Sequence, residues 1–187
     1  MTSKKNTNLE LESDQSQRLI VLDLNGVLYN KTYSKETGIS IKYFEGVDQF
    51  LKKCMDYANI AFFTSTTKKN AAPALHKLIG KYVQDTNYSD KIKFTWFREY
   101  TDTDYDSKNS WDTMKYYHKI KKKYPNYQIV MIDDTESKVR FNPPECTIIV
   151  DNVEETGYFD MLLLDIMWKF FHLDEKHLTN IDSNYPF

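Results

Sequence analysis

Three aspartates stand directly behind apolar runs of this sequence, and their placement indicates a site for phosphoryl chemistry. Asp23 follows the run 18–22, and Asp133 and Asp134 follow the run 128–132. Buried parallel strands read as continuous apolar runs, and open α/β sheets place their chemistry just beyond the carboxyl ends of such strands. Carboxylate oxygens are the ligands that Mg²⁺ prefers, and a bound cation lets clustered acids lie together without mutual repulsion. The three carboxylates therefore predict a metal-dependent phosphoryl-transfer site at one edge of a sheet.

Asp23 itself is a candidate nucleophile. A carboxylate that attacks phosphorus forms an aspartyl-phosphate, which divides hydrolysis into two easier steps. The structural alternative is that Asp23 only caps the following turn, but the flanking pattern over 22–28 is more specific than a lone acid and favours the nucleophile. Gly26 belongs to this pattern, and because it has no Cβ it would let the backbone turn tightly around a bound phosphate.

Two hydroxyl side chains follow another apolar run, 60–63. The hydroxyls of Thr64 and Ser65 and the adjacent backbone N–H groups could bind phosphate at this strand end. Ser and Thr are also the usual N-cap residues of helices, and Asp pairs are common in β-turns. The combination of these groups with Asp23, rather than any one of them alone, favours a phosphate site.

Such a site also needs a basic side chain to offset charge on the phosphoryl oxygens and the nucleophile. The candidates are Lys108, Lys115 and Lys119. Because most lysines in a segment of this kind are solvated, sequence spacing alone leaves all three open.

The elements that must position these residues alternate between strands and helices. Apolar runs predict strands, and helical spacing predicts helices; the strands are expected over 18–22, 60–63, 92–96, 128–132 and 147–150, and the helices over 46–57, 70–79, 111–124 and 159–173. Pro73 is tolerable in the first turn of its helix, Gly80 supplies a left-handed stop, and Pro125 closes the third helix. Segment 29–43 predicts a loop or a hairpin, and 98–110 predicts a polar loop. The alternation predicts an α/β fold with a mainly parallel sheet covered on both faces.

Length and composition limit the class of protein. The 187 residues allow one domain, here 18–187, behind a mobile N-terminal tail over 1–17. A net charge of -2 provides no overall electrostatic attraction for nucleic acid, so we do not expect direct nucleic-acid binding. Cys54 and Cys146 show neither metal spacing nor a disulfide pattern, so we expect a reducing compartment, the cytoplasm or the nucleus. The tail has no apolar core of a signal peptide, and no run reaches the roughly 18 apolar residues of a membrane span. We expect a monomer without membrane contact.

The motifs, taken in order, resemble the haloacid dehalogenase superfamily. The sequence is most similar to its FCP1/SCP-like group, also called NLI-interacting factor-like, the phosphatases of the RNA polymerase II C-terminal domain. The resemblance runs from about 18 to 150 and is carried by Leu22-Asp23-Leu24-Asn25-Gly26-Val27-Leu28, Phe62-Phe63-Thr64-Ser65 and Ile132-Asp133-Asp134, with support from segments 46–51, 96–103 and 141–144. It implies a Rossmann-like three-layer sandwich with a small flap after strand 1 and an insertion between the second and third motifs, for which 29–43 and 84–103 are the candidates.

The resemblance also implies roles for individual residues. Asp23 matches the nucleophile, Thr64 the phosphate-binding hydroxyl, and Asp134 the ligand of Mg²⁺, with Asp133 beside it. Asn25 stands where the family usually has the acid/base aspartate, whose backbone carbonyl also contacts the metal. Lys115 fits the family lysine best, because Tyr117 and Ile120 follow it at the family's spacing; Lys108 is the reserve.

The leading hypothesis is an Mg²⁺-dependent phosphatase that acts on a phosphorylated protein or peptide, at phosphoserine or phosphothreonine. Asn25 lacks the carboxyl group of an acid/base, whose loss typically costs on the order of 10²–10⁴ in rate. The second hypothesis is therefore a pseudophosphatase that binds a phosphopeptide or another protein through the same cleft. A third, a flavodoxin-like or response-regulator domain, predicts neither the Thr-Ser strand end nor the late Asp pair.

Overall fold

A five-stranded parallel sheet forms the centre of the computed structural model, which describes residues 17–36, 38–109, 111–151 and 157–171. In spatial order its strands are β5 (Ile92–Trp96), β4 (Asn59–Phe63), β1 (Arg18–Leu22), β8 (Gln128–Asp133) and β9 (Thr147–Ile149). All four neighbouring pairs are parallel. β1 lies in the middle and is buried along its whole length, which explains its continuous apolar sequence.

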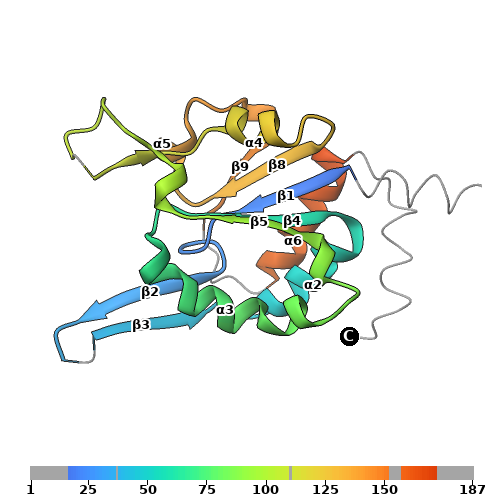
Figure 1. Cartoon of the computed structure of the whole chain (residues 1–187), viewed down its shortest axis with the longest axis horizontal. Coiled ribbons are helices and arrows are strands. Elements are labelled where there is room, and N and C mark those ends of the chain that lie inside the picture. Colours follow the sequence, from blue (N-terminus) through green and yellow to red (C-terminus); the bar gives the residue numbers. More distant parts are fainter. Residues whose placement is uncertain (1–16, 37, 110, 152–156, 172–187) are drawn as a thin grey trace, which may run out of the picture.

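Helices cover both faces of this sheet and complete three layers (Figure 1). Alternate residues of β1 enter two separate cores: Ile20 and Leu22 pack in one, Leu19 and Val21 in the other. The first core also contains α2 (Val47–Tyr57), α3 (Lys68–Gln84) and α6 (Tyr158–Asp165), and the second contains Ile120 of α4 (Tyr117–Lys123) and Val139 of α5 (Glu136–Val139). Each fully buried aliphatic side chain stabilises the fold by roughly 1.5–3 kcal/mol. The α/β sandwich predicted from the sequence is confirmed.

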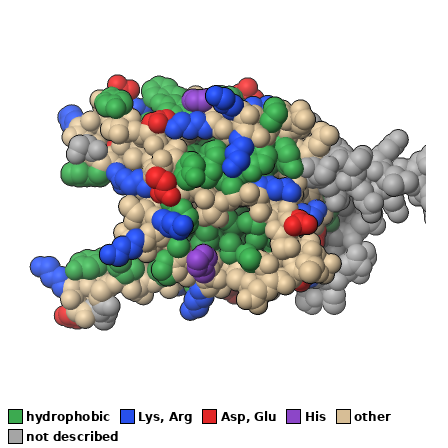
Figure 2. Space-filling model, viewed as in Figure 1, with side chains coloured by type: hydrophobic (Ala, Val, Ile, Leu, Met, Phe, Trp, Pro, Cys, Tyr) green, Lys and Arg blue, Asp and Glu red, His purple; other side chains and the backbone are tan. Residues whose placement is uncertain are grey.

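Two small antiparallel units project from the carboxyl edge of the sheet. The flap after strand 1 is a hairpin of β2 (Tyr29–Ser34) and β3 (Gly38–Tyr43), and a shorter pair is formed by β6 (Asp102–Thr103) and β7 (Thr113–Met114). The surface is hollowed between the hairpin and the loop joining β6 to β7, and Lys and Arg side chains lie on both sides of the hollow (Figures 1 and 2). The remaining short elements are the 3-10 turns η1 (Ser89–Lys91), η2 (Arg98–Tyr100) and η3 (Pro144–Cys146), and the π-helical turn η4 (Ile166–Phe170).

The second predicted helix has the wrong bounds. α3 begins at Lys68 and continues to Gln84, so Pro73 lies beyond its first turn and Gly80 lies inside it. Gly80 is not among the glycines with positive φ, and therefore gives no left-handed stop. The helix continues because Tyr82 is buried and its hydroxyl donates to the Asp48 carboxylate at 2.8 Å.

The third predicted helix, 111–124, is also wrong in its first part. Residues Thr113 and Met114 pair with β6 as a strand, and the helix begins only at Tyr117. Met114 is 1% exposed, so its apolar character reflects strand packing instead of a helical face. Lys115 consequently lies between β7 and α4 and not within a helix.

Other predictions differ in smaller ways. Strand 128–132 extends to Asp133, segment 98–110 contains η2 and β6, and the expected insertion 84–103 includes β5 of the main sheet. The tail over 1–16 and the end of the predicted helix 159–173 lie outside the described residues. Within the described ranges, no helix has both the length and the apolar character that a membrane span requires.

Candidate active site

The register of the sheet places the candidate residues at the same height along three neighbouring strands. Leu22 of β1 pairs with Phe62 of β4 and with Ile132 of β8. The Asp23 N–H donates to the Ile132 carbonyl at 2.9 Å, which extends this pairing by one residue. Asp23 and Thr64 follow β1 and β4, and the pair Asp133-Asp134 lies at the end of β8, so all of them lie at the same carboxyl edge, as expected for an open α/β sheet.

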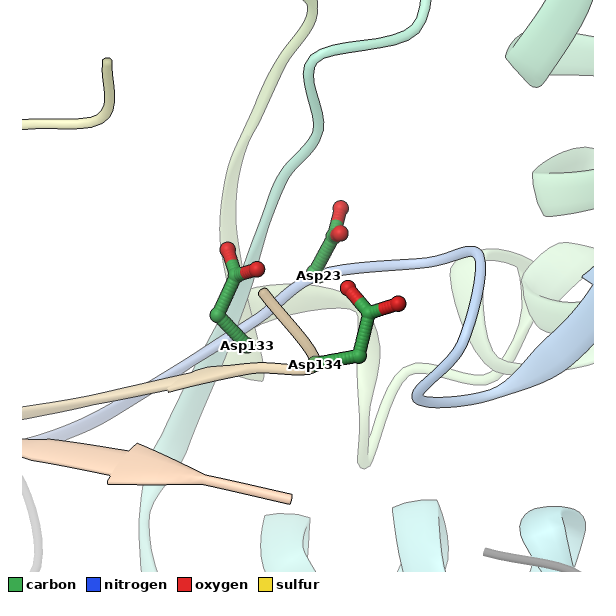
Figure 3. A group of neighbouring side chains, drawn as sticks. All are labelled: Asp23, Asp133 and Asp134. Carbon is green, nitrogen blue, oxygen red and sulfur yellow. The ribbon is translucent and has the colours of Figure 1, made fainter. Parts of the chain in front are cut away.

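The three aspartates form one carboxylate cluster. One oxygen of each of Asp23, Asp133 and Asp134 lies within 4.8 Å of the others. Figure 3 shows the three carboxylates on the same side of the strand ends, two of them from β8 and the residue after it. Asp23 and Asp133 are buried, whereas Asp134 is half-buried. Three carboxylates this close repel one another unless cations lie among them.

Lys115 supplies one such cation. Its Nζ lies 3.0 Å from Asp23 Oδ1 and 2.6 Å from Asp133 Oδ2, and its side chain is 1% exposed. It also lies 5.8 Å from the centroid of the Phe63 ring. Burial lowers the pKa of Lys115, but the charges of Asp23 and Asp133 outweigh this and raise it above its usual range. Lys115 therefore lies as a charged ammonium between Asp23 and Asp133.

The pKa of Asp133 is raised, although pairing with a cation usually lowers the pKa of a carboxyl group. Its burial, together with the charge of Asp23, raises the pKa of Asp133 to about 6, although Lys115 opposes this shift. Its Oδ1 accepts a hydrogen bond from the Thr135 N–H at 3.0 Å. Asp133 thus holds Lys115 and the turn after β8 at the same time.

Asn142 fixes the backbone that follows Lys115. Its Nδ2 donates to the Lys115 carbonyl at 2.9 Å, and its Oδ1 accepts from the Tyr117 N–H at 2.8 Å. The Lys115 N–H in turn donates to the Lys138 carbonyl at 2.8 Å. Sequence reasoning gave Asn142 no role, although it lies within segment 141–144, which carries part of the family resemblance. This side-chain contact has no local sequence signal, because the partners are 25 and 27 residues away.

Gly26 has a packing role that sequence reasoning did not identify. Its φ is +87°, and a Cβ at this position would lie 2.1 Å from Asp134 Oδ2. The space beside Gly26 is therefore filled by the Asp134 carboxylate. Contact of Gly26 with a bound phosphate stays a prediction.

The Asn25 side chain contacts the flap. Its Oδ1 accepts a hydrogen bond from the Lys31 N–H of β2 at 2.8 Å. Asn25 therefore links the loop behind Asp23 to the hairpin. An aspartate here could accept the same hydrogen bond, so the contact does not require an amide.

The two hydroxyls at the end of β4 differ in their partners. Thr64 is 1% exposed, and its Oγ1 accepts from the Thr66 N–H at 3.2 Å, which leaves its own proton available to donate. The Ser65 Oγ is buried and has no hydrogen-bond partner within the described part of the chain. Both groups can donate to an anion at this edge.

The structure brings Lys115 to Asp23 but places the other candidate lysines elsewhere. Lys108 is exposed on the loop between β6 and β7, and Lys119 pairs with the Asp102 carboxylate at 2.7 Å. Lys115 is the lysine that the family resemblance favoured, and the structure places it beside Asp23 and Asp133.

The donor set suits Mg²⁺. The three clustered carboxylates are hard oxygen ligands, and this ion usually takes one or two carboxylates together with water. With Lys115 beside Asp23 and hydroxyl donors after β4, the arrangement can hold a phosphoryl group in front of a carboxylate nucleophile.

A family model described as NLI interacting factor-like phosphatase matches residues 18–173. Among solved structures, the chain is similar to that of Fcp1, an essential RNA polymerase II CTD phosphatase, with 16% identity, a TM-score of 0.47, and coverage of 88% of this chain and 53% of that one. It is also similar to a variant of fission yeast Fcp1 bound to beryllium fluoride, with 14% identity, a TM-score of 0.47, and coverage of 97% and 58%. The chain thus spans little more than half of the length of these two structures. A search of curated proteins found no match.

Proposed function

The chain belongs to the NLI interacting factor-like phosphatases, the FCP1/SCP-like group of the haloacid dehalogenase superfamily, and from this premise we propose that it is an Mg²⁺-dependent phosphomonoester hydrolase. Asp23 is its nucleophile and forms an aspartyl-phosphate. The observation that carries this proposal is the position of Lys115, buried between Asp23 and Asp133 with Asp134 beside them. Burying a lysine and two carboxylates removes their hydration, which costs free energy. This cost favours a functional reason for the arrangement.

Each side chain has a defined task in this proposal. Asp23, Asp133 and Asp134 are the clustered carboxylates that would hold Mg²⁺, together with the Asn25 backbone carbonyl that the family resemblance implies. A bound ion would offset negative charge on the phosphoryl oxygens. Lys115 holds Asp23 in place and attracts the same oxygens. The hydroxyls of Thr64 and Ser65 donate to the phosphoryl group. Donors that are positioned before a reaction begins account for much of the electrostatic stabilisation in enzymes.

The proposed substrate is phosphoserine or phosphothreonine on a protein or peptide. The hollow between the hairpin and the β6–β7 loop, with Lys and Arg side chains on both sides, is a surface that suits an anionic polypeptide (Figure 2). We further propose that the chain acts as a monomer. A location in the cytoplasm or nucleus is supported by Cys54 and Cys146, which are both free thiols.

The test is Mg²⁺-dependent release of nitrophenol from p-nitrophenyl phosphate. Wild type is expected to release it, Asp23→Asn to be inactive, and Asp134→Ala to lose Mg²⁺ binding in calorimetry. Asp102→Asn is the matched control, because Asp102 is a half-exposed acid paired with Lys119. Beryllium fluoride, which imitates a phosphoryl group on a carboxylate, is expected to bind wild type and not Asp23→Asn. Wild type that neither releases nitrophenol nor binds beryllium fluoride would refute the proposal.

Asn25 favours a second candidate, a pseudophosphatase that binds phosphopeptides. Such a protein would bind a phosphoserine peptide with Asp23 or with Asn at that position, and would release no phosphate in either case. Equilibrium binding and phosphate release, measured on the same two proteins, separate the two functions.

A further inference from the structure

Lys138 is a second ammonium at the carboxylate cluster, and it lies on the outer side of the cluster. Its Nζ is 3.9 Å from Asp134 Oδ1, and the two side chains are 30% and 29% exposed. Lys115, in contrast, is 1% exposed and pairs with Asp23 and Asp133. The two lysines therefore contact different carboxylates, and of the two, Lys138 is the one that a bound substrate could reach.

The backbone of α5 fixes the position of Lys138. Its carbonyl accepts a hydrogen bond from the Lys115 N–H at 2.8 Å, and its own N–H donates to the Thr135 carbonyl at 3.1 Å. The next residue, Val139, is 2% exposed and packs in the second core. α5 also packs against β7, and the loop that joins β6 to β7 forms one side of the surface hollow (Figures 1 and 2). Lys138 thus has a rigid backbone beside the cluster, while its half-exposed side chain can change partner.

Arg140, two residues later, is held much more firmly. Its guanidinium makes two contacts of 2.8 Å with the Asp104 carboxylate and one of 3.3 Å with Asp106. The same group lies 4.6 Å from the centroid of the Phe141 ring. Among the described residues, Lys138 makes one ion pair, and that pair is longer, at 3.9 Å. Lys138 is therefore the loosely held cation at this end of the cluster.

The pair between Lys138 and Asp134 is weak enough to exchange. A half-exposed ion pair contributes little free energy, because water screens both charges. Asp134 is also one of the carboxylates assigned to Mg²⁺, and an ion bound there would repel the nearby ammonium. Lys138 would then leave Asp134 and be available to another anion. The hollow beside it carries Lys and Arg side chains on both sides, which favours an anionic polypeptide (Figure 2).

We propose that Lys138 is a specificity-determining residue: with Mg²⁺ bound, its ammonium pairs with a second negative charge of the substrate, on a residue beside the phosphorylated one. This proposal rests on the proposed function, because it concerns the same site. The second charge is a carboxylate or a further phosphate. Successive residues of an extended peptide are about 3.3–3.6 Å apart, so the acidic group of a neighbouring residue lies within reach of a lysine next to the phosphate site. The protein then prefers acidic or multiply phosphorylated segments.

Three peptides test the preference for a second charge. Each has a central phosphonate analogue of phosphoserine, which resists hydrolysis, and the two flanking residues are Gln, Glu or the same phosphonate. With Mg²⁺, wild type is expected to bind the Glu peptide about two- to fivefold more tightly than the Gln peptide, and the peptide with three phosphonates at least as tightly as the Glu peptide. Lys138→Gln should bind the Gln and Glu peptides alike, whereas Lys138→Arg should keep the preference.

Lys119→Gln is the matched control, because Lys119 is 32% exposed and pairs with Asp102 outside the cluster. It should behave as wild type with every peptide. With hydrolysable phosphoserine peptides, the Glu flanks should lower KM in wild type and leave kcat nearly unchanged, and Lys138→Gln should lose this difference. A lysine that served stability alone would not separate KM from kcat in this way.

Calorimetry with Mg²⁺ alone tests the exchange of partners. Lys138→Gln should bind the ion at least about threefold more tightly than wild type or Lys119→Gln, because no ammonium is repelled from Asp134. Equal Mg²⁺ affinity in these proteins would overturn the exchange.

The outcomes for this inference and for the phosphatase are distinguishable. Phosphate release by wild type without a preference for acidic flanks, or with a preference that Lys138→Gln keeps, would overturn this inference and leave the phosphatase intact. Absence of phosphate release, with a preference that Lys138→Gln loses, would overturn the phosphatase and leave Lys138 as the specificity residue of a binding module. Absence of both phosphate release and peptide binding would overturn both.

Discussion

The Lys115 ammonium lies 3.0 Å from Asp23 Oδ1, with the two side chains 1% and 3% exposed. An ion pair this deeply buried loses the hydration of both groups, and its attraction offsets that loss only while both partners are present. Lys115 therefore matters for the stability of the protein without ligand as well as for binding a phosphoryl group.

Lys115→Met is expected to reduce the free energy of unfolding by about 3–5 kcal/mol, because it leaves two facing carboxylates buried without their cation. Urea denaturation measures this loss. Mg²⁺ should stabilise the variant more than wild type, since the ion supplies a positive charge at the same carboxylates. Lys119→Met is the control: it breaks a half-exposed pair and should change stability by no more than about 1 kcal/mol. Equal Mg²⁺ effects on wild type and Lys115→Met would contradict this account.

Gly26→Ala is expected to weaken Mg²⁺ binding by at least about tenfold, because the new Cβ would displace the Asp134 carboxylate, one of the ligands assigned to Mg²⁺. Strain at a φ of +87° adds a loss of about 1–2 kcal/mol of stability. Gly38→Ala is a matched control with a φ of +73° and no atom within 4 Å of its Cβ. Calorimetry with Mg²⁺ should separate the two variants; if both bind the ion as wild type does, Asp134 is not a ligand.

Asn142→Ala should lower stability by about 1–3 kcal/mol, since the Lys115 carbonyl and the Tyr117 N–H lose their partner. Inorganic phosphate or vanadate should also bind more weakly, because Lys115 is no longer held in position. Asn142→Asp keeps the acceptor for Tyr117 but places an oxygen against the Lys115 carbonyl, so it should impair anion binding as well. Unchanged vanadate affinity in both variants would show that Asn142 serves stability alone.

The Asp104–Arg140 pair predicts a dependence of stability on pH. The Arg140 guanidinium makes two contacts of 2.8 Å with the Asp104 carboxylate. These hydrogen bonds hold the pKa of Asp104 below its usual range. A carboxylate whose pKa is lower in the folded than in the unfolded state stabilises the folded state at pH values above its pKa in the unfolded chain, about 3.9. This contribution is lost as the pH falls through the pKa of the folded state.

Asp104→Asn should therefore lower the urea midpoint at pH 7 and have a smaller effect near pH 3. Asp112→Asn, in the same loop, provides the comparison, since the Asp112 carboxylate accepts from Ser107 and Asn109 rather than from an arginine. A difference between wild type and Asp104→Asn that is the same at both pH values would exclude the proposed linkage.

Local sequence patterns were sufficient to predict several elements of the fold. A strand buried on both faces must be apolar throughout, so β1, β4 and β8 were recognisable from short windows, and with them the positions of Asp23, Thr64 and Asp133. The hairpin after strand 1 was left open between a loop and a hairpin, because its polar sequence carries little alternation. The bounds of α3 and α4 were missed where contacts with distant residues override local spacing, as at Tyr82 and Met114.

The sequence by itself determined which residue types could meet at one edge of the sheet, since the carboxyl ends of parallel strands lie together whatever the loops do. Composition and local pattern left three lysines open, the family resemblance favoured Lys115, and the tertiary structure shows that Lys115 lies beside Asp23. The pairing of β7 with β6 and the hydrogen bond from the Asn142 side chain position the backbone at Lys115. Both contacts link residues that are not neighbours in the sequence. The role of Gly26 was decided in the same way, because the carboxylate that fills its missing Cβ lies 108 residues later, on Asp134. Such contacts depend on the three-dimensional path of the chain, so no spacing rule within one segment contains them.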